Sequence, residues 1–225
     1  MESQNYRAVL RRVGGVLVMV GLFDIAWMIY CIVHKISYSS GLNLFAVIAG
    51  ILLMRGSLRT AEGVRWFGTF FLSACMAMLV AWPAIEPVNL ALTTIRLNPG
   101  AFLAGAAIMV VFVAWLYWTL RELGSEPVQA AINAAGVKHR DMRFPIIFGV
   151  LMVFGLAVSL HVMFGSESAK RAMFTAAKQV GPGYQLHIQS LSISNYGSKE
   201  SVTGVVTAWN ANEIREIPIH WESQN

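Results

Sequence analysis

The stretch that decides the fold is FPIIFGVLMVFGLAVSLHVMF, residues 144–164, which contains no Asp, Glu, Lys or Arg. A helix rises about 1.5 Å per residue and has to cross about 30 Å of hydrocarbon, so about 20 apolar residues make one membrane span. Four further runs of this kind precede it, at 13–33, 36–54, 66–85 and 101–120. We number the five runs as spans 1 to 5 and predict an all-α transmembrane bundle within residues 1–165.

The composition favours the same class. Hydrophobic residues make up 56% of the 225 residues and charged residues 13%, and the mean hydropathy is +0.57. A soluble domain usually carries about 25% charged residues. Because lipid cannot hydrogen-bond a backbone, we expect the apolar runs to be closed helices.

Basic residues are divided unequally between the two sets of loops. Ten lie before span 1, between spans 2 and 3, or between spans 4 and 5, whereas the opposite loops carry only Lys35 and Arg96. This asymmetry predicts a bacterial inner-membrane protein with a cytoplasmic N-terminus and a periplasmic C-terminal domain. It also explains the net charge of +5 without nucleic acid as a partner. Six of the ten are predicted to contact the inner leaflet: Arg11, Arg12, Arg55, Arg59, Lys138 and Arg140.

Span 2 is the weakest of the five spans. Its purely apolar part is Leu44–Met54, and it reaches bilayer length only together with residues 36–43. A tilted or interfacial helix is the alternative. We keep it as a span because the charge asymmetry would otherwise collapse and the C-terminal domain would move to the cytoplasm.

Two loops between the spans carry helical patterns. Residues 83–99 are bracketed by prolines and contain spaced leucines, which suits a segment along the outer interface. Residues 121–143 contain a short amphipathic helix that Ser125 could cap and Gly136 could end. That helix could rest on the inner leaflet or simply connect two spans against the bundle.

Residues 166–225 form the second predicted domain, a small extracytoplasmic α+β domain. Ser166 beside Glu167 favours a helix start, and Gly181-Pro-Gly183 ends that helix. Three strand-like runs follow at 184–193, 202–209 and 214–221, which predicts an antiparallel meander. A domain of this size is marginal alone, so we expect it to lean on the membrane, the bundle or another protein.

Asp24, in the middle of span 1, is the sharpest candidate for a functional group. An acid at this depth costs about 2.5 to 3.5 kcal/mol on insertion scales unless it is shielded or neutral. It could be an ion or proton site, or it could hydrogen-bond across helices, with Ser73 of span 3 as a partner. We favour helix packing or subunit association, because no other charged residue lies near the midplane.

The substitution Asp24→Asn separates these two interpretations. It keeps the shape and hydrogen-bonding capacity of the side chain and removes its ionisation. A transporter or channel component that couples through Asp24 should lose solute flux or proton coupling, measured in vesicles. Unaltered flux would remove the transport interpretation.

Other patterns indicate packing and give no chemistry. Small-residue spacings at Ala46–Gly50, Ala101–Gly105 and Gly100–Ala104 predict close helix approach. The two cysteines, Cys31 and Cys75, lie inside spans, which excludes a disulfide framework. The five histidines lack metal-ligand spacing, and no phosphate loop, nucleophile elbow or metallopeptidase motif is present. No metal, cofactor or catalytic residue is therefore predicted, and enzyme activity has no positive support.

The function expected from these features is interaction. We predict an accessory, assembly or scaffolding subunit of a membrane complex, whose C-terminal domain contacts a membrane-protein partner or a second copy of the chain. The alternative is a small transporter or channel component with Asp24 as the coupling group.

Overall fold

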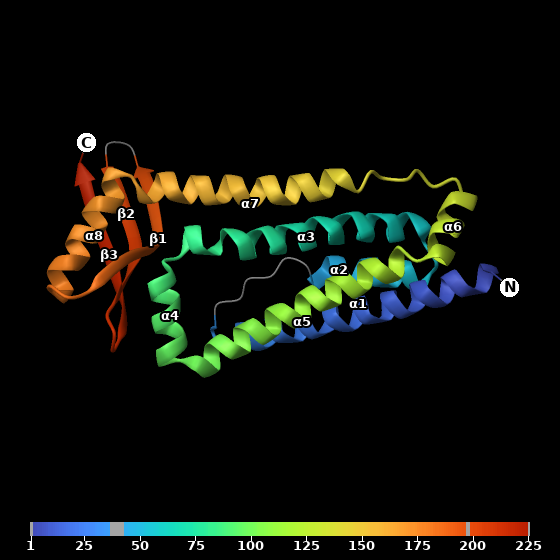
Figure 1. Cartoon of the computed structure of the whole chain (residues 1–225), viewed down its shortest axis with the longest axis horizontal. Coiled ribbons are helices and arrows are strands. Elements are labelled where there is room, and N and C mark those ends of the chain that lie inside the picture. The colour runs from blue at the N-terminus through green and yellow to red at the C-terminus, as the bar shows by residue number, and fades with distance from the viewer. Residues whose placement is uncertain (1, 37–42, 197–198, 225) are drawn as a thin grey trace. The chain divides into compact units, whose positions relative to one another are not determined.

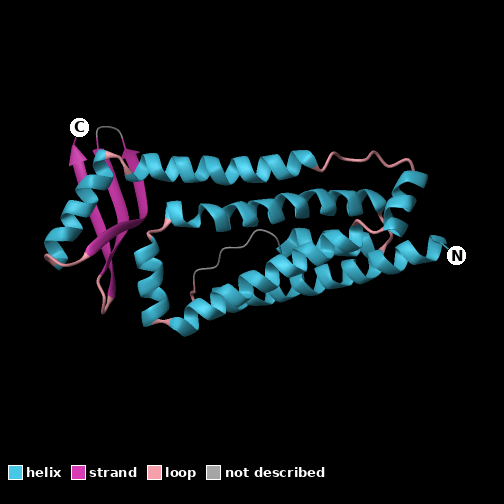
Figure 2. Cartoon of the chain, in the orientation of Figure 1, coloured by secondary structure: helices cyan, strands magenta, loops and turns pink. Residues whose placement is uncertain are grey.

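The computed structural model describes residues 2–36, 43–196 and 199–224. Within these ranges the chain is mostly helical, with a small antiparallel sheet near the C-terminus (Figures 1 and 2). The elements in chain order are α1 (Glu2–Val33), α2 (Asn43–Met54), α3 (Leu58–Ile85), α4 (Val88–Leu97), α5 (Pro99–Leu123), α6 (Glu126–Ala134), α7 (Arg143–Phe164), α8 (Glu167–Val180), β1 (Gln185–Tyr196), β2 (Lys199–Trp209) and β3 (Ile214–Gln224).

Four of the described helices are long and apolar enough to cross a membrane: α1, α3, α5 and α7. Spans 1, 3, 4 and 5 are therefore confirmed as long apolar helices. Their outward surfaces carry large hydrophobic side chains, such as Val80 at 81% exposure and Phe23 at 74%.

The structure does not confirm span 2 as a crossing of full length. The described helix, α2, has 12 residues, which corresponds to about 18 Å at the usual rise. The preceding residues 37–42, on which full length depends, lie outside the described residues. α2 lies alongside α1 (Figure 1).

Two glycines let α1 and α2 approach this closely. A Cβ added at Gly14 would lie 2.5 Å from the Gly50 carbonyl oxygen, and one at Gly50 would lie 2.6 Å from the Gly14 oxygen. Neither position can hold a larger residue unless the helices separate. The predicted small-residue spacing Ala46–Gly50 therefore lies in the contact between α2 and α1. The predicted spacings in α5 make no such contact, because no described residue lies within 4 Å of a Cβ placed at Gly100 or Gly105.

The chain divides into two compact units, residues 1–75 with 111–150 and residues 76–110 with 151–225. The boundary passes through α3, α5 and α7. The core of the first unit joins α1, α2, α3, α5 and α6, and its buried members are Leu10, Val13, Leu17, Leu53, Ala61, Leu123, Val128 and Ile132. The predicted helix between spans 4 and 5 is α6, which buries Val128 and Ile132 in this core.

One detail of that helix differs from the prediction. Ser125 occupies the N-cap position, but its hydroxyl donates to the Glu122 carbonyl at 2.7 Å and makes no side-chain cap. The carbonyls at the end of α5 attract the hydroxyl, because only two residues separate α5 from α6. Gly136 ends the helical region with φ +63°, as predicted.

The second unit contains the helix and meander predicted from the sequence. The sheet has the order β1-β2-β3, and α8 covers one face of it (Figure 2). The side chain of Ser166 accepts a hydrogen bond from the Ala169 amide, so the predicted cap is formed. Three fully buried alanines, Ala169, Ala172 and Ala176, place α8 directly on the sheet.

Candidate functional site

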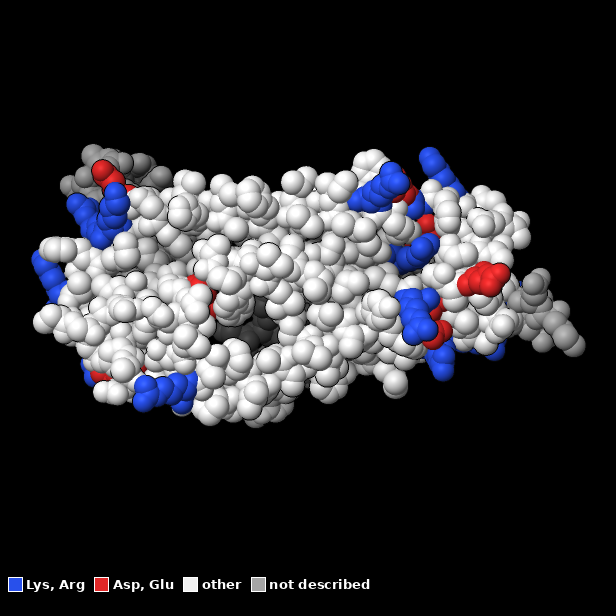
Figure 3. Space-filling view, viewed as in Figure 1, with Lys and Arg blue, Asp and Glu red and all other residues white. Residues whose placement is uncertain are grey.

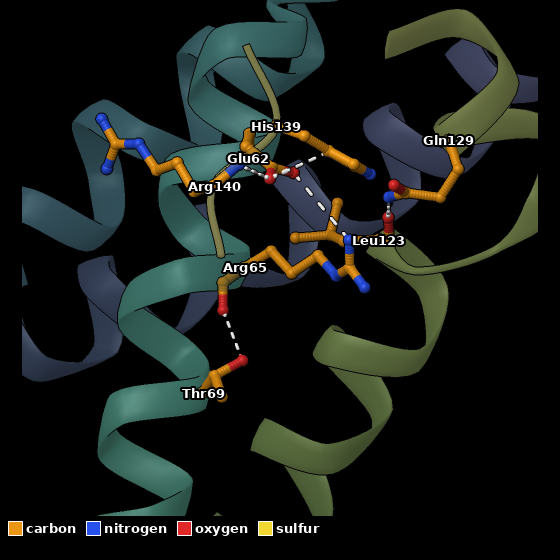
Figure 4. A network of polar contacts seen from close by, with 7 residues as sticks. All are labelled: Glu62, Arg65, Thr69, Leu123, Gln129, His139 and Arg140. Atoms are coloured by element: carbon orange, nitrogen blue, oxygen red, sulfur yellow. Dashed lines mark hydrogen bonds and ion pairs between the residues drawn. The ribbon is translucent and has the colours of Figure 1, made fainter. Parts of the chain in front are cut away.

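Glu62 is a buried acid on α3. Its exposed fraction is 1%, and it lies beside the equally buried Ala61 at the edge of the first unit's core. A charged carboxylate removed from water requires compensating partners. Figure 4 shows those partners, which come mainly from the α6–α7 segment, residues 135–142.

The α6–α7 segment binds one oxygen of this carboxylate. Glu62 Oε1 accepts a hydrogen bond from the Arg140 amide at 2.9 Å and lies 3.2 Å from Nδ1 of His139. The second oxygen, Oε2, lies 3.9 Å from a guanidinium nitrogen of Arg65 and has no hydrogen-bond partner among the described residues. The main chain at His139 and Arg140 is therefore fixed to α3.

This arrangement can hold the α6–α7 segment in place on α3. Among the described residues, the partners of this carboxylate are the main-chain amide of Arg140 and the side chains of His139 and Arg65. Val137 adds an apolar contact between the same segment and the core. A buried hydrogen-bonded charge of this type fixes geometry more than it adds stability.

Glu62 was not predicted as a site residue. The acid stands among Arg59 and Arg65 in what reads as an ordinary exposed helix start. The Arg140 amide that donates to its carboxylate lies 78 positions later in the chain. No local sequence pattern marks this acid as buried.

Known proteins do not assist the interpretation. No family model, no curated protein and no solved structure matches this chain.

The predicted inner-leaflet residues all lie in the first unit. Arg11, Arg55, Arg59, Lys138 and Arg140 are exposed, and no described ion pair involves them. Arg12 is also largely exposed and pairs with Glu122 at 3.5 Å. Figure 3 shows Lys and Arg side chains gathered at the end of the first unit that carries the N-terminus and α6.

The two predicted intramembrane polar residues serve different contacts. The Ser73 hydroxyl donates to the Phe70 carbonyl at 2.9 Å and lies 3.3 Å from the Pro145 carbonyl. A Cβ at Gly149 would collide with Ser73 Oγ, so this residue belongs to the contact between α3 and α7. Asp24 is partly buried on α1. The hydrogen bonds of Ser73 go to main-chain carbonyls and not to Asp24.

The C-terminal domain is joined closely to α7. Only Gly165 and Ser166 separate α7 from α8. Phe164, the last residue of α7, packs against the domain's core, and its ring lies edge-on to His187 with the centroids 5.7 Å apart. The end of α7 is thus part of the same packed structure as the sheet.

His187 should make the stability of this domain depend on pH. Burial lowers the pKa of His187 from its ordinary value of about 6.5. The unfolded chain then takes up a proton at a higher pH than the folded chain, so stability is complete above about pH 6.5 and falls as the pH drops below it. Thermal unfolding at pH 7.5 and 5.5 should show this loss, and His187→Phe should reduce it.

The matched control is His220→Phe, which changes an exposed histidine on β3. Measurements should stay above pH 5, because Glu213 responds below that range. A hydrogen bond from Tyr184 and the charge of Arg215, 2.9 Å away, lower the pKa of Glu213, so its contribution is lost only below about pH 4.5. Equal pH dependence in both variants would contradict the assignment to His187.

Proposed function

We propose that this chain is a non-enzymatic accessory, assembly or scaffolding subunit of a membrane complex. It lies in the bacterial inner membrane with its N-terminus in the cytoplasm and its C-terminal domain in the periplasm. The observation that carries the proposal is the set of four long apolar helices whose side chains face outward, joined to a small domain without a catalytic constellation in its described residues.

The exposed surface of the helices supports a lipid environment. Ile108 is 71% exposed and Phe154 is 65% exposed, in helices that carry few charged residues. In water, a contiguous apolar surface of this extent would cause aggregation. In a bilayer it is the ordinary outer surface of a helix, since lipid tails are equally apolar.

In the first unit, the starts of helices that follow basic segments lie together, which supports one cytoplasmic end of this unit. One cleft is lined by Asn5 and Tyr6 of α1, by Leu58 of α3 and by residues of α6. The starts of α1 and α3 and the connection from α5 to α7 therefore lie at one end. Each of α1, α3 and α7 leaves that end, whatever the length of α2.

The C-terminal domain is suited to bind a partner through its faces. β1 has a register shift between Ile188 and Ser190, and β3 carries the exposed Pro218. Bulges and prolines on edge strands discourage the addition of another strand. On α8, the ring of Phe174 is 61% exposed, and Nζ of Lys178 lies 4.4 Å from the ring centroid. Protein interfaces often use an exposed aromatic side chain of this kind as an anchor.

Reporter fusions test the orientation. Alkaline phosphatase fused behind Asn225 should be active, because it folds only outside the cytoplasm, and a fluorescent protein at the same position should stay dark. A fusion after Gly136, in the α6–α7 segment, is the matched control and should give the opposite pair of results. Cytoplasmic fluorescence from the fusion at Asn225 would overturn the orientation and the periplasmic contact together.

Native mass spectrometry tests the role in a complex. The chain, purified at its native expression level in mild detergent, should carry a second component in fixed ratio, and Phe174→Ser should release it. Gln179→Ser, an exposed change on the same helix, should not. Recovery of the chain alone under these conditions would contradict the scaffolding proposal.

A further inference from the structure

We propose that the α6–α7 segment presents Lys138 and Arg140 as a binding pair for the phosphate of an anionic phospholipid, and that Glu62 is the positioning residue of this pair. The inference rests on the proposed membrane placement and assigns a ligand class to its cytoplasmic end. No lipid contact is needed to hold the segment, because Glu62 holds it already.

Neighbouring side chains of the α6–α7 segment differ in their contacts. The half-exposed His139 lies 3.2 Å from Glu62 through its Nδ1, whereas the exposed side chains of Lys138 and Arg140 make no described ion pair. Arg140 contacts the carboxylate through its main-chain amide, and Figure 4 shows its guanidinium directed away from Glu62. The anchor therefore uses the backbone and the intervening imidazole, and it leaves both cationic side chains pointing outward.

The charges of this pair are not neutralised within the described chain. Neither Lys138 nor Arg140 lies within ion-pair distance of a described carboxylate. The nearest acid in sequence, Asp141, accepts a hydrogen bond from the Arg143 amide at 2.8 Å. Arg55, in the turn before α3, and Arg59, in the first turn of α3, are likewise exposed and unpaired among the described residues. An anionic ligand complements this surface.

The neighbouring residues favour a lipid over a soluble phosphate. α7 begins at Arg143, three residues after Arg140, and its first turns expose Phe144 at 68% and Ile147 at 56%. A phosphate bound at Lys138 and Arg140 would thus lie next to apolar side chains that could contact acyl chains. Basic residues at this position gain about 1 kcal/mol each from anionic lipid, which corresponds to about a fivefold effect on affinity.

The test is a titration of short-chain phosphatidylglycerol into the full chain in a zwitterionic detergent, with bound lipid measured by native mass spectrometry. The double variant Lys138→Gln/Arg140→Gln should bind about 30-fold more weakly. The matched control is Lys170→Gln/Arg171→Gln, which removes the same charge from two adjacent exposed residues of α8 and should bind like the wild type. Equal binding by both double variants would overturn the proposal.

Glu62 is tested by a conservative and a disruptive change. Glu62→Gln keeps an oxygen for the Arg140 amide and should retain lipid affinity within about twofold, whereas Glu62→Leu should lose at least fivefold although both cations remain. Trypsin should also cleave after Lys138 and Arg140 faster in Glu62→Leu. Wild-type affinity in a folded Glu62→Leu protein would remove the positioning role, and if that variant does not fold, the double variant still decides the proposal.

Two further arms identify the ligand and separate this inference from the proposed function. Glycerol phosphate carries the headgroup charge without acyl chains, and binding as tight as that of phosphatidylglycerol would show a soluble phosphate site and overturn the lipid assignment. The reporter fusions at Asn225 and Gly136 report orientation independently. A correct orientation with no lipid preference would refute this inference alone.

Discussion

Replacing Gly14 or Gly50 by alanine should destabilise the protein, whereas replacing Gly15 by alanine should not. The Cβ of alanine at Gly14 or Gly50 would meet the opposite helix's carbonyl oxygen at 2.5 or 2.6 Å, so α1 and α2 would have to separate. Overpacking of this kind costs about 1 to 3 kcal/mol. Since 1 kcal/mol shifts the unfolding temperature by about 2 to 4 °C in a chain of this size, the loss should reach several degrees in detergent.

Gly15 provides a control of opposite sign on the same helix. Nothing described lies within 4 Å of a Cβ at this position. Alanine is favoured over glycine inside a helix by about 1 kcal/mol, so Gly15→Ala should leave the unfolding temperature unchanged or raise it. If Gly14→Ala and Gly15→Ala have the same effect, the close contact between α1 and α2 is wrong.

Ala172→Leu should unfold or severely loosen the C-terminal domain. Ala172 is fully buried between α8 and the sheet, with Ala169 and Ala176 on either side of it. The extra carbons of leucine have no space between α8 and the sheet. Overpacking of this kind lowers the free energy of unfolding by about 1 to 3 kcal/mol. A domain of about 60 residues has little stability to lose. Limited proteolysis should then cut within residues 166–225, and the near-ultraviolet signal of Trp209 and Trp221 should weaken.

Gln179→Leu, an exposed change on the same helix, is the control and should leave proteolysis unchanged. Resistance of Ala172→Leu to the protease would mean that α8 does not rest on the sheet through its alanines. Because the apolar helices are a separate source of stability, the membrane fraction should still contain the full-length variant before protease is added.

The local features of the sequence predicted the elements well. The helix after Ser166 begins and ends where its cap and Gly181 indicated, because these signals act on adjacent residues. Spans 1, 3, 4 and 5 appear as long apolar helices for the same reason. Span 2 was less secure, since its apolar run alone is too short to span a bilayer and α2 is the 12-residue helix that this run forms.

The pairings between distant residues could not be predicted. Gly14 and Gly15 are adjacent glycines that no sequence pattern distinguishes. Only the position of α2 shows that Gly14, and not Gly15, lies in the contact between the two helices. Ser73 was considered as a partner of Asp24, but its hydroxyl lies 3.3 Å from the Pro145 carbonyl at the start of α7. Glu62 is charged like its exposed neighbours, so no local pattern marks it as buried.

The sequence by itself determined that apolar helices of bilayer length alternate with basic connections and end in a small helix-and-sheet domain, because hydrophobic run length, capping and strand alternation are properties of neighbouring residues. Only the tertiary structure decided that α2 rests on Gly14 and that Glu62 holds the backbone at Arg140. Both contacts depend on distances between segments far apart in the chain, and a side chain's burial is set by those segments and not by its own neighbours.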